Sequence, residues 1–267
     1  MKALVRRFPF AAFLLIAFGW TWPLAAGIRV SMILPLLALF GPLLGAVVVL
    51  GTMEGREGLA RLWRKFALRR RHLPWLVVAI ALPLFLVIPV WWLERLSGSA
   101  LEFALGPISA LSLILALLIV GEEVGWRGFA LPYLLEQWPA LWSGVGLGVA
   151  WALWHLPNFF LPGFPHKGLP FTAFILMIVS FSILFTWLYL RTQGSLLVAV
   201  VFHAALNLFS VAGLDQARQY WWRALVYGLV ALAVVAGGGL RARMVAEETQ
   251  DETLPRDQRG LDLRSQS

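Results

Sequence analysis

Long apolar segments recur along the whole chain and are separated by short polar or basic stretches. Each segment holds about 20 residues, the length that an α-helix needs to cross the hydrocarbon core of a bilayer. The pattern predicts eight spans, at roughly 9–27, 32–51, 74–93, 108–128, 143–160, 171–190, 195–213 and 222–240. The expected fold is therefore an all-α polytopic membrane protein. It comprises one transmembrane domain over residues 1–243 and a disordered tail over 244–267, where charged residues mix with Gln, Ser and Pro.

Composition agrees with this class of protein. The mean hydropathy is +0.78, and 60% of the residues are hydrophobic while only 13% are charged, which is outside the range of soluble domains. The strict alternation that marks the strands of an outer-membrane barrel is not seen. There is no cysteine, which excludes disulfides, thiolate metal ligands and a cysteine nucleophile.

The net charge is +8, and the Lys and Arg residues are distributed unevenly between the two sides of the predicted topology. When alternate connections between the eight spans are assigned to opposite sides, seventeen of the 22 Lys and Arg residues, Arg127 included, fall on one side. The positive-inside rule makes that side cytoplasmic, with both chain termini in the cytoplasm and the protein in the plasma membrane. The same placement argues against a nucleic-acid partner, and the sequence predicts no oligomeric state.

The basic segment 54–72 connects the second and third predicted spans. Its large apolar residues recur at helical spacing, at Leu59, Leu62, Trp63 and Phe66. This pattern favours an amphipathic helix that lies on anionic lipid headgroups. Docking of a substrate is the alternative.

Few polar residues remain inside the predicted spans, and they fall into three clusters. Glu122 and Glu123 follow fourteen uncharged residues and precede Arg127 by only a few positions. An ionisable side chain at a helix centre costs roughly 2.5–3.5 kcal/mol, so such residues usually face a protein interior or a wet cavity and mark function. The other two clusters are His155 in the fifth span, and His203 with Asn207 in the seventh. We expect the three helices to deliver these groups to a similar depth.

Helix geometry separates the two glutamates. Residues four apart share a helix face, whereas neighbours point in different directions. We therefore expect Glu123 to pair with Arg127 as a structural clamp and Glu122 to point at the histidines. His203 and Asn207 are also four apart and can converge on one point. Gly121, Gly125 and Gly128 should let a neighbouring helix or a substrate backbone approach closely.

This set of groups suits hydrolysis by an activated water. A carboxylate beside a histidine, here Glu122 and His155, can orient and deprotonate a water molecule. His203 and the Asn207 amide supply donors for an oxyanion. Alternatively Glu122, His155 and His203 could hold Zn²⁺, since two His and one Glu form a known catalytic ligand set. The H-E-x-x-H motif of many zinc proteases is absent, however, so no cofactor is favoured and zinc is kept as the alternative.

At these residues the sequence resembles the CAAX-protease and bacteriocin-processing family of intramembrane endopeptidases, also called the Abi family or type II CAAX proteases. The family's Glu-Glu-x-x-x-Arg motif is matched at residues 122–127, and its His-x-x-x-Asn motif at residues 203–207. The Phe-x-x-x-His motif reads Trp151-Ala-Leu-Trp-His155, with Trp in place of the usual Phe. The three motifs occur in the family's order, within a core of about residues 108–213.

The resemblance implies eight helices around a cytoplasm-facing polar cavity. Glu122 would activate water with His155, and His203 and Asn207 would stabilise the oxyanion. The expected activity is hydrolysis of a peptide bond in a membrane-associated peptide or in the C-terminus of a prenylated protein. The alternatives are a proton-coupled transporter, because buried Glu and His also form proton relays, and a non-catalytic membrane scaffold or immunity protein. Transporters commonly show two related halves, whereas the polar groups here crowd into 122–207.

Overall fold

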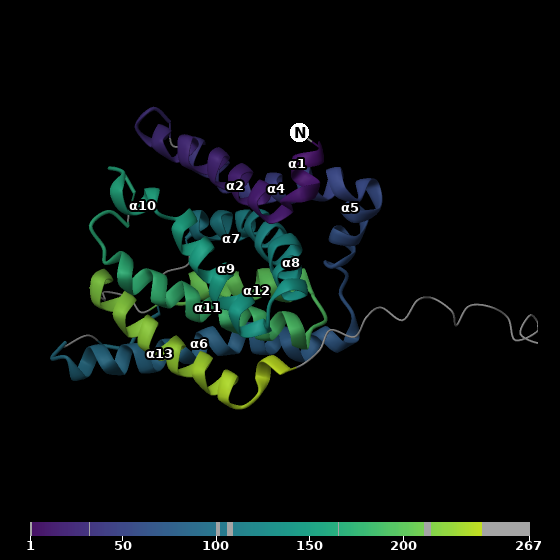
Figure 1. Cartoon of the computed structure of the whole chain (residues 1–267). Helices are drawn as coiled ribbons and strands as arrows, with labels where there is room; N and C mark the ends of the chain where they lie inside the picture. Colours follow the sequence, from purple (N-terminus) through teal and green to yellow (C-terminus); the bar gives the residue numbers. More distant parts are fainter. Residues whose placement is uncertain are drawn as a thin grey trace, which may run out of the picture.

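A computed structural model describes residues 2–31, 33–99, 102–105, 109–164, 166–210 and 215–241. The predicted disordered tail, 244–267, lies outside these residues. The described residues form helices joined by short connections (Figure 1). The α-helices are α1 Lys2–Arg7, α2 Pro9–Ala26, α3 Ile33–Ala38, α4 Gly41–Met53, α5 Gly55–Arg64, α6 Leu73–Leu96, α7 Ala110–Glu123, α8 Leu131–Gln137, α9 Ala140–Trp154, α10 Pro157–Phe160, α11 Phe171–Arg191, α12 Leu196–Leu208 and α13 Gln216–Ala236. Single turns of 3₁₀-helix occur at η1 Gly27–Arg29, η2 Arg70–His72 and η4 Gly239–Arg241, and η3 Val124–Ala130 is a π-helix.

The protein is an all-α polytopic membrane protein. Five helical segments in the described residues are long and apolar enough to cross a membrane: 9–29, 33–53, 70–96, 171–191 and 216–236. They overlap five of the eight predicted spans, and the last of them is 216–236 where the sequence predicts 222–240. The other three predictions fall on α7 with η3, on α9 and on α12, which are shorter or interrupted. These three segments carry the polar clusters. Since they are not among the five long apolar helices, the count of eight spans stays a prediction.

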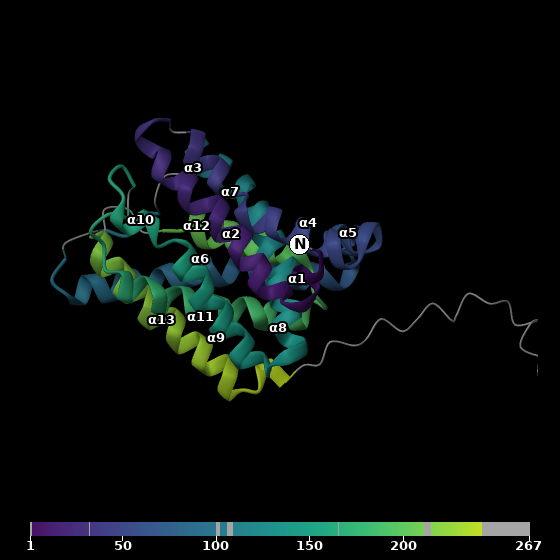
Figure 2. The same ribbon diagram turned by 45° about the horizontal axis from the view of Figure 1, so that its top comes forward.

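Helix α11 lies at the centre of the bundle. It packs against α9, α12 and α13, and α13, α11 and α9 run side by side in Figure 2. Glycines on α9 permit the close approach of α11. A Cβ on Gly148 would lie only 2.7 Å from the Val179 Cα, and one on Gly144 would lie 2.9 Å from Thr186 Oγ1. Lipid provides no hydrophobic driving force for the association of helices. Contacts between membrane helices therefore often use small residues, which let the two backbones pack closely.

Helix α4 supports the segment that carries the paired glutamates. It packs against α2 and against η3. A Cβ on Gly125 would lie 2.3 Å from the Pro42 Cβ and 2.5 Å from the Pro42 carbonyl carbon, so the two backbones are in direct contact. The close helix approach expected at this glycine is therefore present.

The basic segment after α4 is folded as predicted. Helix α5 is amphipathic, with Leu62 buried and its basic residues exposed. Leu62 packs against Gly128 of η3. Figure 1 shows α5 beside α1, so the basic residues of both helices gather at one end of the bundle.

Candidate active site

The paired glutamates lie at the end of α7, where the helix changes to the π-helical turn η3. Every residue from Gly121 to Ala130 is buried. A π-helical segment within an α-helix is rare and often occurs at a functional site. The expectation of a regular α-helix through Glu-Glu-x-x-x-Arg was therefore wrong in detail, although the two acidic side chains still diverge.

Glu123 pairs with Arg127 as the spacing predicts. Its Oε1 lies 2.9 Å from Arg127 Nη1, and both side chains are fully buried. This guanidinium is in the core, so Arg127 is not a surface charge and does not support the count that assigns the cytoplasmic side. The guanidinium lies over the rings of Trp151 and Phe185, 4.2 and 3.7 Å from their centroids. Stacking on aromatic faces partly replaces the hydration that a buried cation loses.

His203 binds the same carboxylate. Its Nδ1 lies 2.7 Å from Glu123 Oε1. The expected division, in which Glu122 faces both histidines and Glu123 pairs with Arg127 alone, does not include this contact. The structure corrects this assignment, since Glu123 joins α7 and η3 to α12 through His203. The spacing of residues along one helix cannot reveal a contact made between two helices.

Glu122 accepts a hydrogen bond from a residue that the sequence analysis treated only as an aromatic. Trp151 Nε1 donates to Glu122 Oε2 at 3.1 Å, and both residues are buried. An indole N–H is a donor that needs a partner when it is buried. Two features of the sequence indicate such a bond: the second motif has Trp in place of Phe, and a buried indole N–H needs an acceptor.

His155 caps the C-terminal end of α9. The fifth span is predicted to run to residue 160, but α9 ends at Trp154. His155 and Leu156 donate to carbonyls only three residues back, and Pro157 has no N–H with which to continue the helix. The His155 Nδ1 lies 2.9 Å from the Trp151 carbonyl oxygen. Its ring also packs against Trp154 and Phe174.

Trp151 is thus the residue around which the cluster is built. It hydrogen-bonds Glu122 through its indole and His155 through its carbonyl. Its ring meets His203 edge to face, with the centroids 5.1 Å apart. Side chains from α7, η3, α9 and α12 are therefore joined at one aromatic residue.

Asn207 is separate from this network. It is exposed, and its side chain makes no hydrogen bond with another described residue. It is located one turn beyond His203 on α12, but the structure does not bring its amide to the carboxylates.

The predicted zinc ligands do not form a cluster either. Within the part of the chain that is described, no three His, Asp or Glu side chains are grouped so that they could hold a metal ion. One oxygen of Glu122 and the Nδ1 atoms of both histidines are engaged by Trp151 and Glu123. The metal dependence of the site stays open to experiment.

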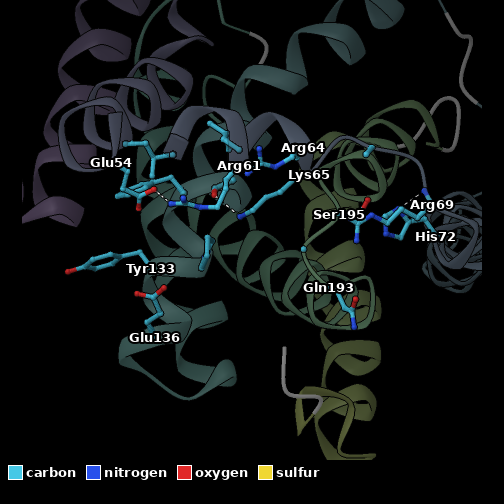
Figure 3. Close-up of a pocket in the computed structure, with 18 of the residues that line it drawn as sticks. Glu54, Arg61, Arg64, Lys65, Arg69, His72, Tyr133, Glu136, Gln193 and Ser195 are labelled. Atoms are coloured by element: carbon cyan, nitrogen blue, oxygen red, sulfur yellow. Dashed lines mark hydrogen bonds and ion pairs between the residues drawn. The ribbon is translucent and has the colours of Figure 1, made fainter. Parts of the chain in front are cut away.

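Two cavities among the described residues are considered for the site. One, of about 660 Å³, lies between α5, α8 and the turn joining α11 to α12 (Figure 3). The other, of about 530 Å³, is an apolar groove between α2 and α9. Neither is lined by Glu122, His155, His203 or Asn207. The polar cavity that the resemblance implies around these residues is not one of the two, and Glu122 and His203 are buried.

Comparison with known proteins confirms the resemblance that the motifs indicated. Residues 104–209 match the family described as Type II CAAX prenyl endopeptidase Rce1-like. A curated relative, CAAX prenyl protease 2 of Methanococcus maripaludis, is 24% identical over 200 residues, which cover 68% of this chain and 72% of the relative. The matched region contains all of the predicted site residues, and both findings support a membrane protease.

Proposed function

We propose that this protein is an intramembrane endopeptidase that uses Glu122 to activate water. The observation that carries the proposal is the convergence of Glu122 and His155 on Trp151, which holds a carboxylate and an imidazole in fixed orientations. The matched family and relative support the reaction class. We place the protein in the plasma membrane. In the proposed orientation, the basic end of the bundle, which contains α1 and α5, faces the cytoplasm.

In this proposal Glu122 is the general base. Its carboxylate takes a proton from a water molecule, whose oxygen attacks the scissile carbonyl. The tetrahedral intermediate then collapses as Glu122 returns the proton to the leaving amine. Trp151 Nε1 occupies one lone pair of Oε2 and so orients the carboxylate.

His155 is proposed to orient the same water molecule. A hydrogen on Nδ1 donates to the Trp151 carbonyl oxygen, which leaves the lone pair of Nε2 free as an acceptor. A water held by both Glu122 and His155 would have its attacking lone pair directed away from these two acceptors.

His203 is proposed to stabilise the oxyanion. For this role its Nε2 must carry a hydrogen. Because Nδ1 lies against the Glu123 carboxylate, a hydrogen on each ring nitrogen would let His203 donate to Glu123 and to the oxyanion at once. Glu123, which also pairs with Arg127, then holds the His203 ring in position through Nδ1. Asn207, one turn further along α12, is the proposed second donor once substrate is bound.

The substrate class follows from the relative's name. We propose a prenylated protein C-terminus, with an unlipidated membrane-associated peptide as the other candidate. Two peptides that differ only in a prenyl group on the same cysteine distinguish them. If the substrate is prenylated, the enzyme should cleave the prenylated peptide with a higher kcat/KM than the unprenylated one.

The decisive experiment replaces Glu122 with Gln in protein reconstituted into liposomes. Loss of the general base should lower kcat about 10²- to 10⁴-fold. Glu57→Gln is the matched control, because Glu57 is an exposed glutamate on α5 that lines neither cavity. Wild-type cleavage by Glu122→Gln would overturn the assignment. Inactivation by a chelator with rescue by Zn²⁺ would replace the metal-free mechanism with a zinc one.

A further inference from the structure

The 660 Å³ cavity has a strongly basic lining that the proposed reaction does not use. Helix α5 and the loop after it line one side, α8 a second, and the turn after α11 a third (Figure 3). Its volume is in the range of small-molecule sites. The charged lining residues are Arg61, Arg64, Lys65, Arg69, Arg71, Glu54 and Glu136.

Most of this positive charge has no internal partner. Arg61 forms an ion pair with Glu54. Arg64, Arg69 and Arg71 form no ion pair with any residue that the structure describes. The lining therefore has an excess of positive charge that a bound anion could neutralise.

Two further polar groups lie deeper. Lys65 Nζ donates to the Gly128 carbonyl and to the Tyr189 hydroxyl, each at 3.1 Å, which holds the ammonium at the inner wall. His72 also lines the cavity and is 97% buried. Its Nδ1 accepts from the Arg69 backbone N–H, and the backbone of Ala67 and Thr192 lies beside its ring, so His72 contributes a polar wall to the cavity.

The position of the cavity indicates the source of the anion. Helix α5 and the following loop connect the end of one membrane-spanning segment, 33–53, to the start of another, 70–96. The turn that lines the opposite wall follows a third, 171–191. Connections at the ends of spans lie at headgroup depth. Trp63 on α5 is half exposed and stacks on Phe66, as expected of an aromatic at the interface.

We infer that this cavity binds the phosphate headgroup of an anionic phospholipid. Arginine forks match phosphate oxygens in geometry and charge, and basic pockets between membrane helices are suited to such headgroups. The site differs from a diffuse attraction of the whole segment 54–72 to the membrane, because particular residues line it. Gly128, at its inner wall, belongs to the π-helical turn that also carries Arg127.

Binding can be tested without any protease assay. The full-length protein in a neutral detergent is titrated with phosphatidylglycerol or phosphatidylcholine, and bound lipid is measured by native mass spectrometry. Arg64→Gln with Arg71→Gln should weaken phosphatidylglycerol binding at least about thirtyfold. The matched control, Arg56→Gln with Arg70→Gln, removes two exposed charges from the same segment that do not line the cavity. It should bind within threefold of wild type.

Three results would overturn the inference. Equal losses in the two double variants would show diffuse surface attraction. Equal binding of phosphatidylcholine would show that the anionic headgroup is not recognised. Glycerol 1-phosphate that binds as tightly as the lipid, with the same dependence on Arg64 and Arg71, would identify a soluble phosphate as the ligand. Melting temperatures of both double variants check that each is folded.

Discussion

Trp151 donates its indole N–H to Glu122 Oε2 at 3.1 Å in the interior of the bundle. The family motif that this segment resembles has Phe at this position, and a phenyl ring has no N–H to donate. In this chain the aromatic residue of the motif therefore also orients the proposed catalytic carboxylate.

Trp151→Phe should lower kcat roughly ten- to hundredfold with little change in KM. The variant keeps an aromatic ring but loses one hydrogen bond to a charged group, worth about 1.5–3 kcal/mol. Steady-state cleavage of a peptide in liposomes measures both constants. Trp222→Phe is the control, because it removes a similar indole bond to Glu94, outside the site cluster. Wild-type kcat in Trp151→Phe would show that the bond does not position Glu122.

Arg127→Leu should destabilise the protein by about 3–5 kcal/mol, because it leaves the Glu123 carboxylate buried without its main counter-ion. Adding Glu123→Gln to it should recover part of that loss. Thermal unfolding of the single and double variants measures the coupling. If the two substitutions simply add, the pair is not the clamp that the geometry indicates.

Gly125→Ala should destabilise the fold by about 1–3 kcal/mol, since the new methyl group meets the Pro42 backbone and forces α4 away from η3. Gly128→Ala offers a matched comparison. Its methyl group would meet the end of the Leu62 side chain at 2.5 Å and that of Leu196 at 3.5 Å, so side-chain atoms would have to move and not backbone. Thermal unfolding should show the larger loss for Gly125→Ala, and the opposite order would contradict the tight contact with α4.

The loop residue His166 should make stability depend on pH. Burial lowers the pKa of His166 from its ordinary value of 6.5, and its ring packs among Phe159, Phe174 and Tyr220. The unfolded chain then binds more protons than the folded one as pH falls through about 6.5, so folding stability decreases on acidification.

His166→Phe should remove this contribution while keeping the ring packing. The difference in melting temperature between variant and wild type should shift in favour of the variant from pH 7.5 to pH 5.5. Lys167→Gln, an exposed neighbour, should show no such shift. A constant difference between His166→Phe and wild type across this range would rule out the titration.

The sequence determined the membrane class, the helical fold and the identity of the polar residues at depth, because these depend on local apolar length and on the cost of burying charge. It also predicted the pairing of Glu123 with Arg127, since both lie on one helical turn. The tertiary structure decided the rest. The bond from His203 to Glu123, the bond from Trp151 to Glu122 and the basic cavity beneath α5 all join residues far apart in the chain. Such contacts depend on how helices pack against one another, and periodicity within a single helix carries no information about that.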